Sequence, residues 1–305
     1  MACCVRGASV RWFVTGIPRH ATGDRKERTI SINSPEREAE ASVRRLSRLR
    51  RQPQTHHKAP EPTISVVIPT LNEAANLPHV LTRIPPSVSE VIVVDGHSID
   101  DTVVVARSIL PDARILLQSG RGKGNALACG FAAATGEIIV MLDADGSTDP
   151  AEIPDLVAPL LRGADFAKGS RFMPGGDSAD ITPLRKAGNR MLTMSVNLLH
   201  GTQFTDLCYG YNAFRADCLD SIRLDCQGFE VETMINVRVA RAGLQMVEVP
   251  SVEAPRLYGE SKLRTMSDGW RVLRTILRER VRGRRAQSDC DEWRPHYHEL
   301  AAETA

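Results

Sequence analysis

The sequence lacks the features that would mark a disulfide-bonded or membrane-spanning protein. Its seven cysteines are odd in number and include no C-x-x-C pair, and the chain is large enough to fold without disulfide bonds. We therefore expect ordinary buried thiols in a reducing compartment. Nowhere do about 18 uncharged apolar residues run together, as a spanning helix requires, and Arg6 and Arg11 interrupt the apolar residues near the N-terminus. These absences predict a soluble or peripheral protein.

The body of the chain also lacks the basic excess of a nucleic-acid-binding domain. Residues 1–60 contain 13 Lys and Arg against 5 Asp and Glu, whereas the remaining chain contains 26 basic and 32 acidic residues. Domains that bind nucleic acid concentrate positive charge on one face. We therefore expect no nucleic-acid partner. We interpret residues 1–62 as a basic, disordered extension and linker, in which Ser34 can cap a helix as far as Arg51.

From Thr63 onward, short apolar segments alternate with segments of helical length. The apolar segments, rich in β-branched residues, lie at residues 64–69, 91–95, 113–117 and 137–143. The segments of helical length lie between them at residues 74–84, 100–110 and 124–135. Continuous apolar strands are buried on both faces, and strands that alternate with helices form parallel sheets through right-handed crossovers. The sequence therefore predicts an α/β fold with a mostly parallel, Rossmann-like sheet between helix layers.

The second half of the chain is less regular, and we expect it to complete the same catalytic domain. Its recognisable segments are strands at residues 165–169 and 210–214, helices at residues 183–200 and 229–242, and a loop at Pro174-Gly175-Gly176. The expected organisation is an extension at residues 1–62, a catalytic domain at residues 63–263 and a basic amphipathic helix and tail at residues 264–305.

A polar cluster follows each of the four predicted strands in the first half. In open sheets of this kind, ligands bind outside the carboxyl ends of the strands. Four polar clusters at four strand ends therefore predict one binding site. The clusters are Asn72-Glu73, Asp95-Gly96, Gly120 to Gly124, and Asp143 to Asp145.

Asp143-Ala144-Asp145 places two carboxylates on the turn that leaves a buried strand. Hard oxygen ligands of this kind bind Mg²⁺ or Mn²⁺, and the ion can bridge a pyrophosphate. A nucleoside diphosphate becomes a good leaving group once such a cation neutralises its developing charge. The alternative interpretation is that both aspartates merely cap the turn before Pro150.

Two further segments have the chemistry to contact a nucleotide. Gly120 to Asn125 follows a strand and opens a helix, so that its backbone N–H groups and Lys123 can approach phosphate. The segment is no Walker A motif, because no Ser or Thr follows the lysine, and it is no G-x-G-x-x-G motif. Asp95 ends the second strand, where its carboxylate can accept hydrogen bonds from a base or ribose or can simply close the turn.

Together these segments resemble the inverting family 2 glycosyltransferases over about residues 63–263. The motifs that carry the resemblance are Pro69-Thr-Leu-Asn-Glu73, Val94-Asp95-Gly-x-Ser98-x-Asp100-Asp-Thr102, Gly122-Lys-Gly-x-Ala126 and Leu142-Asp-Ala-Asp-Gly146. Within that family the chain is most similar to the dolichyl- and polyprenyl-phosphate mannosyl- and glucosyltransferases. That likeness rests on Lys168-Gly-Ser-Arg-Phe172, Asp206-x-x-x-Gly-Tyr211 and Gly259-x-Ser261-Lys262-Leu263.

The resemblance implies a GT-A fold and a set of site residues. It implies that Pro69, Asn72, Glu73 and Asp95 line the nucleotide site, and that Asp143 and Asp145 flank the metal and the donor diphosphate. It also implies that Arg171, Ser261 and Lys262 approach phosphate groups of donor or acceptor, which suits their side-chain chemistry. Two departures concern the acceptor: Tyr209 stands where the lipid-phosphate enzymes usually have Ser, and many of those enzymes carry C-terminal spanning helices.

The nature of the acceptor decides whether the protein must supply a base. Inversion requires a nucleophile that is deprotonated on the face opposite the departing diphosphate. A phosphate acceptor is already ionised near neutrality, because its second pKa is about 6. A hydroxyl acceptor needs a carboxylate, and the candidates are Asp206, Glu230 and Glu232. Because residues two apart diverge on a helix, we expect a structural or surface role for one of the two glutamates.

The segment at residues 262–285 contains nine Lys and Arg against two acidic residues. Its apolar residues have spacings that can form one stripe on a helix, namely Trp270, Leu273, Ile276, Leu277 and Val281. Such a helix either lies on anionic lipid as a peripheral membrane contact or docks its stripe on the catalytic core while its arginines face water.

We therefore expect a metal-dependent, inverting hexosyltransferase that uses a UDP- or GDP-hexose and a polyprenyl phosphate, in the cytoplasm or on the inner face of the cytoplasmic membrane. Alternatives are transfer to a hydroxyl in cell-envelope polysaccharide or glycolipid synthesis, and a non-catalytic donor-binding subunit. A sugar-phosphate nucleotidyltransferase would have a glycine-rich loop directly after the first strand, where Pro69-Thr-Leu-Asn-Glu73 stands instead.

Overall fold

The structure is a computed structural model that describes residues 61–261, 263–282 and 297–300. The extension predicted at residues 1–62 therefore lies almost wholly outside the described residues, together with the helix predicted from Ser34 to Arg51. Lys262 also lies outside them. The described residues belong to one compact unit.

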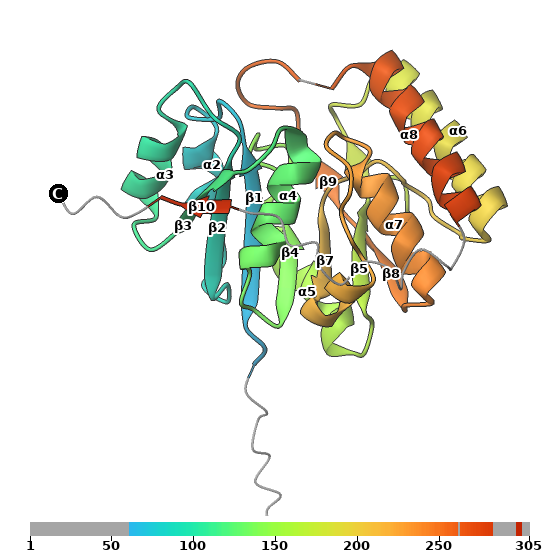
Figure 1. The fold of residues 1–305 in the computed structure, drawn as a ribbon, viewed down its shortest axis with the longest axis horizontal. Helices are drawn as coiled ribbons and strands as arrows, with labels where there is room; N and C mark the ends of the chain where they lie inside the picture. The colour runs from blue at the N-terminus through green and yellow to red at the C-terminus, as the bar shows by residue number, and fades with distance from the viewer. Residues whose placement is uncertain (1–60, 262, 283–296, 301–305) are drawn as a thin grey trace, which may run out of the picture. The chain divides into compact units, whose positions relative to one another are not determined.

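Eight strands form the central sheet. They are β1 (Ile64–Thr70), β2 (Glu90–Asp95), β3 (Arg114–Gln118), β4 (Ile138–Met141), β5 (Phe166–Ser170), β7 (Asn212–Arg215), β8 (Met246–Pro250) and β10 (Tyr297–Glu299). Their order is β10-β3-β2-β1-β4-β7-β5-β8 (Figure 1). Four neighbouring pairs are parallel, while β7 is antiparallel to β4 and β5, and β10 is antiparallel to β3. The predicted α/β fold with a mostly parallel sheet is confirmed.

The central strand β1 shows why the sheet lies between two helix layers. Its residues Val66, Val67 and Ile68 are all fully buried, and successive side chains of a strand point to opposite faces. Val67 packs in a cluster with α4 (Gly122–Ala133) and α7 (Val231–Ala242). Val66 and Ile68 pack in the other cluster, to which helices of the opposite face contribute. Those helices are α2 (Leu77–Leu81), α3 (Thr102–Ile109) and α5 (Ile153–Leu161).

The remaining elements complete the domain. Two short 3₁₀ helices, η1 (Pro150–Glu152) and η2 (Ala216–Asp220), follow strands, and β6 (Asp177–Ser178) pairs in parallel with β9 (Val252–Glu253) outside the main sheet. The sequence did not predict α5, β6, β8, β9 or β10. The helix expected at residues 74–84 is reduced to α2, which begins next to Pro78 and is followed by Pro85 and Pro86.

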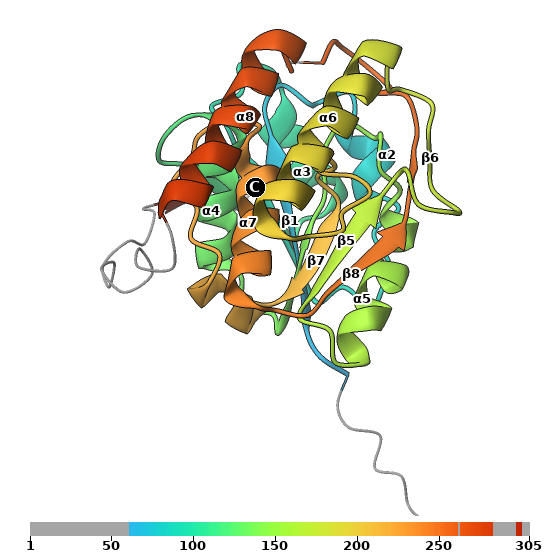
Figure 2. The same ribbon diagram turned by 90° about the vertical axis from the view of Figure 1, so that its right-hand side faces the viewer.

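Two long helices, α6 (Pro183–His200) and α8 (Thr265–Arg282), pack beside α7 in a third apolar cluster (Figure 2). Within α8 the predicted single apolar stripe is divided. Ile276 is buried and Leu273 is half-buried against the cluster, whereas Trp270, Leu277 and Val281 are exposed. The helix therefore docks on the domain by one face and presents apolar side chains on another. Within the described ranges, no helix combines the length and the apolar character needed to cross a bilayer.

Gly130→Ala tests the close packing of α4 against β1. A Cβ atom at Gly130 would lie 2.3 Å from Cγ1 of Val67. Alanine is favoured over glycine in a helix interior by about 1 kcal/mol, but we expect this clash to lower the free energy of unfolding by about 1–3 kcal/mol in urea denaturation. Gly188→Ala in α6 is the control, because its Cβ would meet nothing within 4 Å. Unchanged or increased stability of Gly130→Ala would contradict the packing.

Candidate active site

A cavity of about 560 Å³ opens at the carboxyl ends of the first four strands. Each of the four predicted polar clusters contributes to its wall, and so does a later segment of the chain. The lining includes Pro69 and Glu73 after β1, Gly96 and His97 after β2, Arg121 to Lys123 after β3, Asp143 and Asp145 after β4, and Arg256 and Ser261. The structure therefore brings together residues that are distant in the sequence. Pro69 and Ser261, which line the same cavity, lie about 200 positions apart.

Lys123 connects the first of the two aspartates to α7. Its ammonium group lies 2.6 Å from Oδ1 of Asp143 and 2.7 Å from Oε1 of Glu232. Burial alone lowers the pKa of Lys123, but the two carboxylates outweigh burial and hold that pKa above its usual value. Burial raises the pKa of Glu232, Lys123 partly offsets this effect, and Asp143 reinforces it. Lys123 thus stays charged between two carboxylates at the cavity wall.

The glycines around Lys123 serve close packing. Gly122 has a φ of +82°, and a Cβ there would lie 2.1 Å from the carbonyl oxygen of Gln227. A Cβ at Gly124 would lie 2.4 Å from the carbonyl oxygen of Cys226, and the Gly124 N–H donates to Gln227. The expectation that this loop offers backbone N–H groups to phosphate is therefore wrong for Gly124. Lys123 itself does reach the cavity.

Arg256 compensates the second aspartate, and sequence analysis missed it. Its Nη1 lies 3.2 Å from Oδ2 of Asp145, and its Nη2 lies 2.5 Å and 2.6 Å from the two carboxylate oxygens of Glu73. Asp145 also accepts hydrogen bonds from the backbone N–H and hydroxyl of Ser147. The only signal in the sequence is a basic residue three positions before the Gly259-x-Ser261 motif. Arg256 thereby ties the segment after β9 to the loops after β1 and β4.

The two aspartates suit a divalent cation that arrives with its substrate. In the described part of the chain, no group of three His, Cys, Asp or Glu side chains converges as a ready-made metal centre. Mg²⁺ is commonly held by one or two carboxylates together with substrate phosphates. Asp143 and Asp145 supply that number of carboxylates, next to a cavity whose cations Lys123 and Arg256 suit phosphate. The donor set therefore fits a metal–diphosphate pair.

Asn72 and Asp95 support the cavity wall and are not among its lining residues. Asn72 has a φ of +55°; its backbone N–H donates to the Ser98 hydroxyl, and its side-chain oxygen accepts from the Ile99 N–H. One carboxylate oxygen of Asp95 accepts from the Ser98 N–H, and the other is buried without a partner among the described residues. Asn72 thus connects the loops after β1 and β2, and Asp95 retains a free acceptor.

A second cavity, of about 360 Å³, meets the first at the two aspartates. Both cavities are lined by Lys123, Asp143, Asp145, Arg256 and Ser261. The second one continues between α6 and α8, and its wall also includes Arg171, Arg185, Asn189, Glu232 and Glu253. Arg185 was not predicted as a site residue. Glu230 lines a different cavity, so the expected divergence of Glu230 and Glu232 is confirmed.

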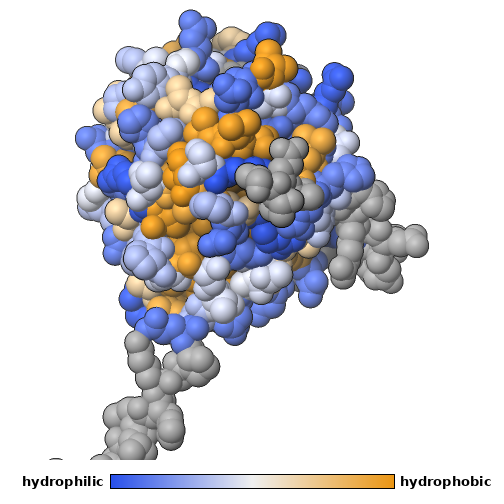
Figure 3. All heavy atoms as spheres, turned by 90° about the vertical axis from the view of Figure 1, so that its left-hand side faces the viewer, coloured by the Kyte–Doolittle hydropathy of each residue, from blue (hydrophilic) through white to orange (hydrophobic). Residues whose placement is uncertain are grey.

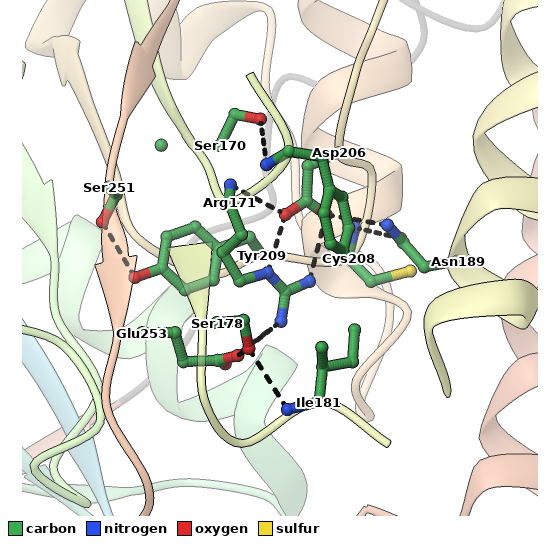
Figure 4. Close-up of polar contacts among 12 residues, drawn as sticks. Ser170, Arg171, Ser178, Ile181, Asn189, Asp206, Cys208, Tyr209, Ser251 and Glu253 are labelled. Atoms are coloured by element: carbon green, nitrogen blue, oxygen red, sulfur yellow. Dashed lines mark hydrogen bonds and ion pairs between the residues drawn. The ribbon is translucent and has the colours of Figure 1, made fainter. Parts of the chain in front are cut away.

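Arg171 is held in a network of buried polar groups (Figure 4). Its Nε and Nη2 donate to the two carboxylate oxygens of Asp206 at 2.7 Å and 3.0 Å, and its Nη1 donates to Glu253. Asn189 donates a further hydrogen bond to Asp206, and the guanidinium lies 4.7 Å from the centre of the Tyr209 ring. Tyr209, the departure from the family pattern, thus packs on the arginine that borders the second cavity.

Asp206 is poorly suited to act as a general base. It is fully buried and does not line either cavity of the site. Burial raises its pKa, but the hydrogen bonds and charge of Arg171 outweigh burial and hold that pKa below its usual value. A carboxylate with a lowered pKa and no contact with the cavity takes up a proton weakly. The geometry instead gives Asp206 the role of positioning Arg171, and it leaves Glu232 as the candidate base that faces the second cavity.

Comparison with protein families places this chain among glycosyltransferases. The family model described as Glycosyl transferase family 2 matches residues 65–223. The chain is 34% identical over 212 residues to the undecaprenyl-phosphate mannosyltransferase of Micrococcus luteus. The aligned region covers 66% of this chain and 87% of that protein. It is 32% identical over 211 residues to the polyprenol monophosphomannose synthase of Mycolicibacterium smegmatis, covering 65% and 80% of the two chains.

Solved structures give the same fold. The structure of glucosyl-3-phosphoglycerate synthase from Mycobacterium tuberculosis in complex with Mn²⁺, uridine-diphosphate-glucose and glycerol 3-phosphate has a TM-score of 0.59 at 28% sequence identity. The match covers 72% of this chain and 80% of that one. That protein therefore combines a related fold with a divalent cation, a nucleotide sugar and a small phosphorylated compound.

Asp206→Asn tests the ion pair with Arg171. Removing one partner of a buried pair costs about 3–5 kcal/mol of unfolding free energy, which we expect to measure by urea denaturation at pH 7. Because folding lowers the pKa of Asp206, its contribution is present above the usual carboxyl pKa and is lost as the pH falls through the lowered one. The difference between wild type and variant should therefore shrink below about pH 4.

Asp112→Asn, at an exposed position, is the control for this comparison. Its effect on the free energy of unfolding should stay within about 0.5 kcal/mol, as is usual for surface substitutions. A loss in Asp206→Asn no larger than that of the control would contradict the buried ion pair.

Proposed function

This chain belongs to glycosyl transferase family 2, and we propose that it transfers a hexose from a UDP- or GDP-hexose to a polyprenyl phosphate, with inversion and with Mg²⁺ or Mn²⁺. The observation that carries the proposal is the junction of two cavities at Asp143 and Asp145, with Lys123 and Arg256 on the shared wall. We assign the catalytic domain to residues 63–263, between the extension at residues 1–62 and the basic segment at residues 264–305.

In this proposal the nucleotide occupies the first cavity. The loops after β1, β2 and β3 surround the base and ribose. Asp95 lies behind this lining and holds the loop after β2 through the Ser98 N–H, and its contact with the nucleotide is proposed from the family resemblance. Lys123 and Arg256 stand where the diphosphate has to lie if the sugar is to reach the second cavity. A divalent ion held by Asp143 and Asp145 would stabilise the charge of the departing nucleoside diphosphate.

The second cavity supplies the acceptor side. Arg171 and Arg185 line it, and guanidinium groups recognise phosphate through paired N–H donors. Asp206 and Glu253 fix the orientation of Arg171, and Ser261 adds a hydroxyl at the junction. Lys262, which lies outside the described residues, is proposed from the family resemblance to approach a phosphate group of donor or acceptor. An ionised phosphate is itself the nucleophile, so this reaction requires no protein base.

Transfer to a hydroxyl group is a second candidate, and Glu232 is the observation that favours it. Its carboxylate faces the second cavity, and burial raises its pKa. A carboxylate with a raised pKa is a better proton acceptor. The Mycobacterium tuberculosis synthase was also solved in complex with phosphoglyceric acid, a compound that bears a hydroxyl group. Under this alternative Glu232 would remove the hydroxyl proton.

Transfer of radiolabelled sugar from UDP-glucose and GDP-mannose tests the proposal. With Mg²⁺ or Mn²⁺ and polyprenyl phosphate, we expect label in the organic phase, and we expect EDTA to abolish it. Asp145→Asn should reduce the rate by about 100-fold or more, because it removes one of the two carboxylates that would hold the cation. Asp155→Asn, on the exposed side of α5, is the matched control and should leave the rate unchanged.

Organic-phase label that resists both EDTA and Asp145→Asn would contradict the metal-dependent mechanism. Label that appears only in a soluble glycoside would move the acceptor to a hydroxyl compound. Binding of the nucleotide sugar without transfer to either acceptor would favour a non-catalytic donor-binding subunit.

Glu232→Gln separates the two acceptors. With polyprenyl phosphate we expect the rate to stay within about tenfold of wild type, because loss of general-base catalysis costs about 10²–10⁴-fold only where a base is needed. With this acceptor, wild type and Glu232→Gln should show the same dependence of the rate on pH, because Glu232 does not act as the base. A loss of 100-fold or more, accompanied by the disappearance of such a pH dependence, would identify Glu232 as the base and a hydroxyl as the acceptor.

A further inference from the structure

The helices α6 and α8 lie side by side and run in the same direction (Figure 1, Figure 2). Their inner faces pack together with α7 through residues such as Leu192, Val196, Val272 and Ile276. Both helices begin at the end of the sheet where the parallel strands end and where the two cavities open. The outer faces of this helix pair form one surface beside the candidate active site.

That surface carries an unusual share of the exposed apolar side chains. Of the sixteen large hydrophobic residues that are exposed in the described chain, eight lie on these two helices. Their exposed fractions range from 49% to 86%, and their spacing places them on one stripe of each helix. They are Leu184, Met191, Met194 and Leu198 on α6, and Met266, Trp270, Leu277 and Val281 on α8. Exposed apolar residues that gather in this way mark an interaction surface.

The same surface carries positive charge. The helix α6 contains three Lys and Arg and no acidic residue, and α8 contains five Arg and two acidic residues. Both acids, Asp268 and Glu279, are buried against the domain. The exposed Lys186, Arg190, Arg274 and Arg280 form no ion pair among the described residues. The outer face therefore combines apolar stripes with uncompensated cations.

A second copy of the chain fits this surface poorly. In a two-fold dimer a patch meets itself, so the basic residues of one copy would face those of the other with no exposed acid from either helix. A surface with negative head groups above an apolar interior matches both the charge and the apolar stripes. We propose that the outer face of α6 and α8 together binds an anionic lipid bilayer.

This orientation also bears on the acceptor, and that part rests on the proposed function. The wall of the second cavity includes Gly188, Asn189 and Leu192 of α6 and Thr265, Asp268 and Val272 of α8. The cavity thus lies between the amino-terminal halves of the two helices that contact the bilayer. A lipid-linked phosphate would then reach Arg171 and Arg185 while its chain stays in the membrane.

Vesicle co-sedimentation of the full chain tests the surface. We expect binding to vesicles of phosphatidylcholine with about 30% phosphatidylglycerol, little binding to phosphatidylcholine alone, and weakening by salt, since charge attraction to lipid is screened. Met194→Glu with Trp270→Glu and Leu277→Glu should weaken binding at least about tenfold. Val104→Glu with Leu161→Glu is the matched control, because these exposed apolar residues lie on α3 and at the end of α5. The side that carries α3 mixes apolar and hydrophilic surface (Figure 3).

Three outcomes would overturn the proposal. The first is that wild type does not bind anionic vesicles, and the second is that the variant with Met194→Glu, Trp270→Glu and Leu277→Glu, the face variant, binds them as tightly as the control does. The third is that wild type is a dimer in light scattering and that only face variants are monomers. The last would assign the surface to a second copy.

Transfer to a short, water-soluble isoprenyl phosphate, measured without vesicles, tests the proposed function separately from membrane binding. The face variants should retain that transfer, and its absence in wild type would count against the proposed function while leaving vesicle binding intact.

Discussion

Two negative side chains at the end of a buried strand need nearby positive charge, and the arrangement of this site follows from that need. Asp143 is compensated by Lys123 at the start of α4, and Asp145 by Arg256 from the segment after β9. Each cation also contacts a second carboxylate, Glu232 or Glu73. Four segments that are distant in the sequence therefore meet around one pair of aspartates. The position of the two cavities on either side of that pair is a direct result.

The first half of the fold and the outline of the site were predictable because their signals are local. A buried parallel strand is a continuous apolar segment in the sequence. The residues that directly follow such a strand are polar where the loop forms part of a ligand site. The segments around Val66, Ile92 and Val140 follow this rule, so the strands and the clusters after them could be located from sequence. The matches to family 2 and to solved structures agree with that reading.

The rest depends on contacts between distant residues, which no local pattern records. The three residues Tyr297 to Glu299 pair with β3, although the segment is short and polar and resembles a loop in sequence. Arg256 is a site residue because the segment after β9 lies next to Asp145 in three dimensions, a contact that no local sequence pattern indicates. Asp206 looked like a candidate base because it stands in a family motif, but its bidentate pairing with Arg171 became visible only in three dimensions. The glycines beside Lys123 likewise resembled a phosphate loop, while their close neighbours are backbone atoms of residues 226 and 227.

The guanidinium of Arg256 has a consequence for how charge enters and leaves this site. It pairs with both Asp145 and Glu73, so a cation that bound Asp145 in the proposed reaction would replace Arg256 as the counter-ion of that carboxylate. The guanidinium group, still paired with Glu73, would then have donors available for phosphate oxygens. In the proposed reaction Arg256 would thus hold Asp145 before the donor binds and would compete with the departing product for that carboxylate afterwards.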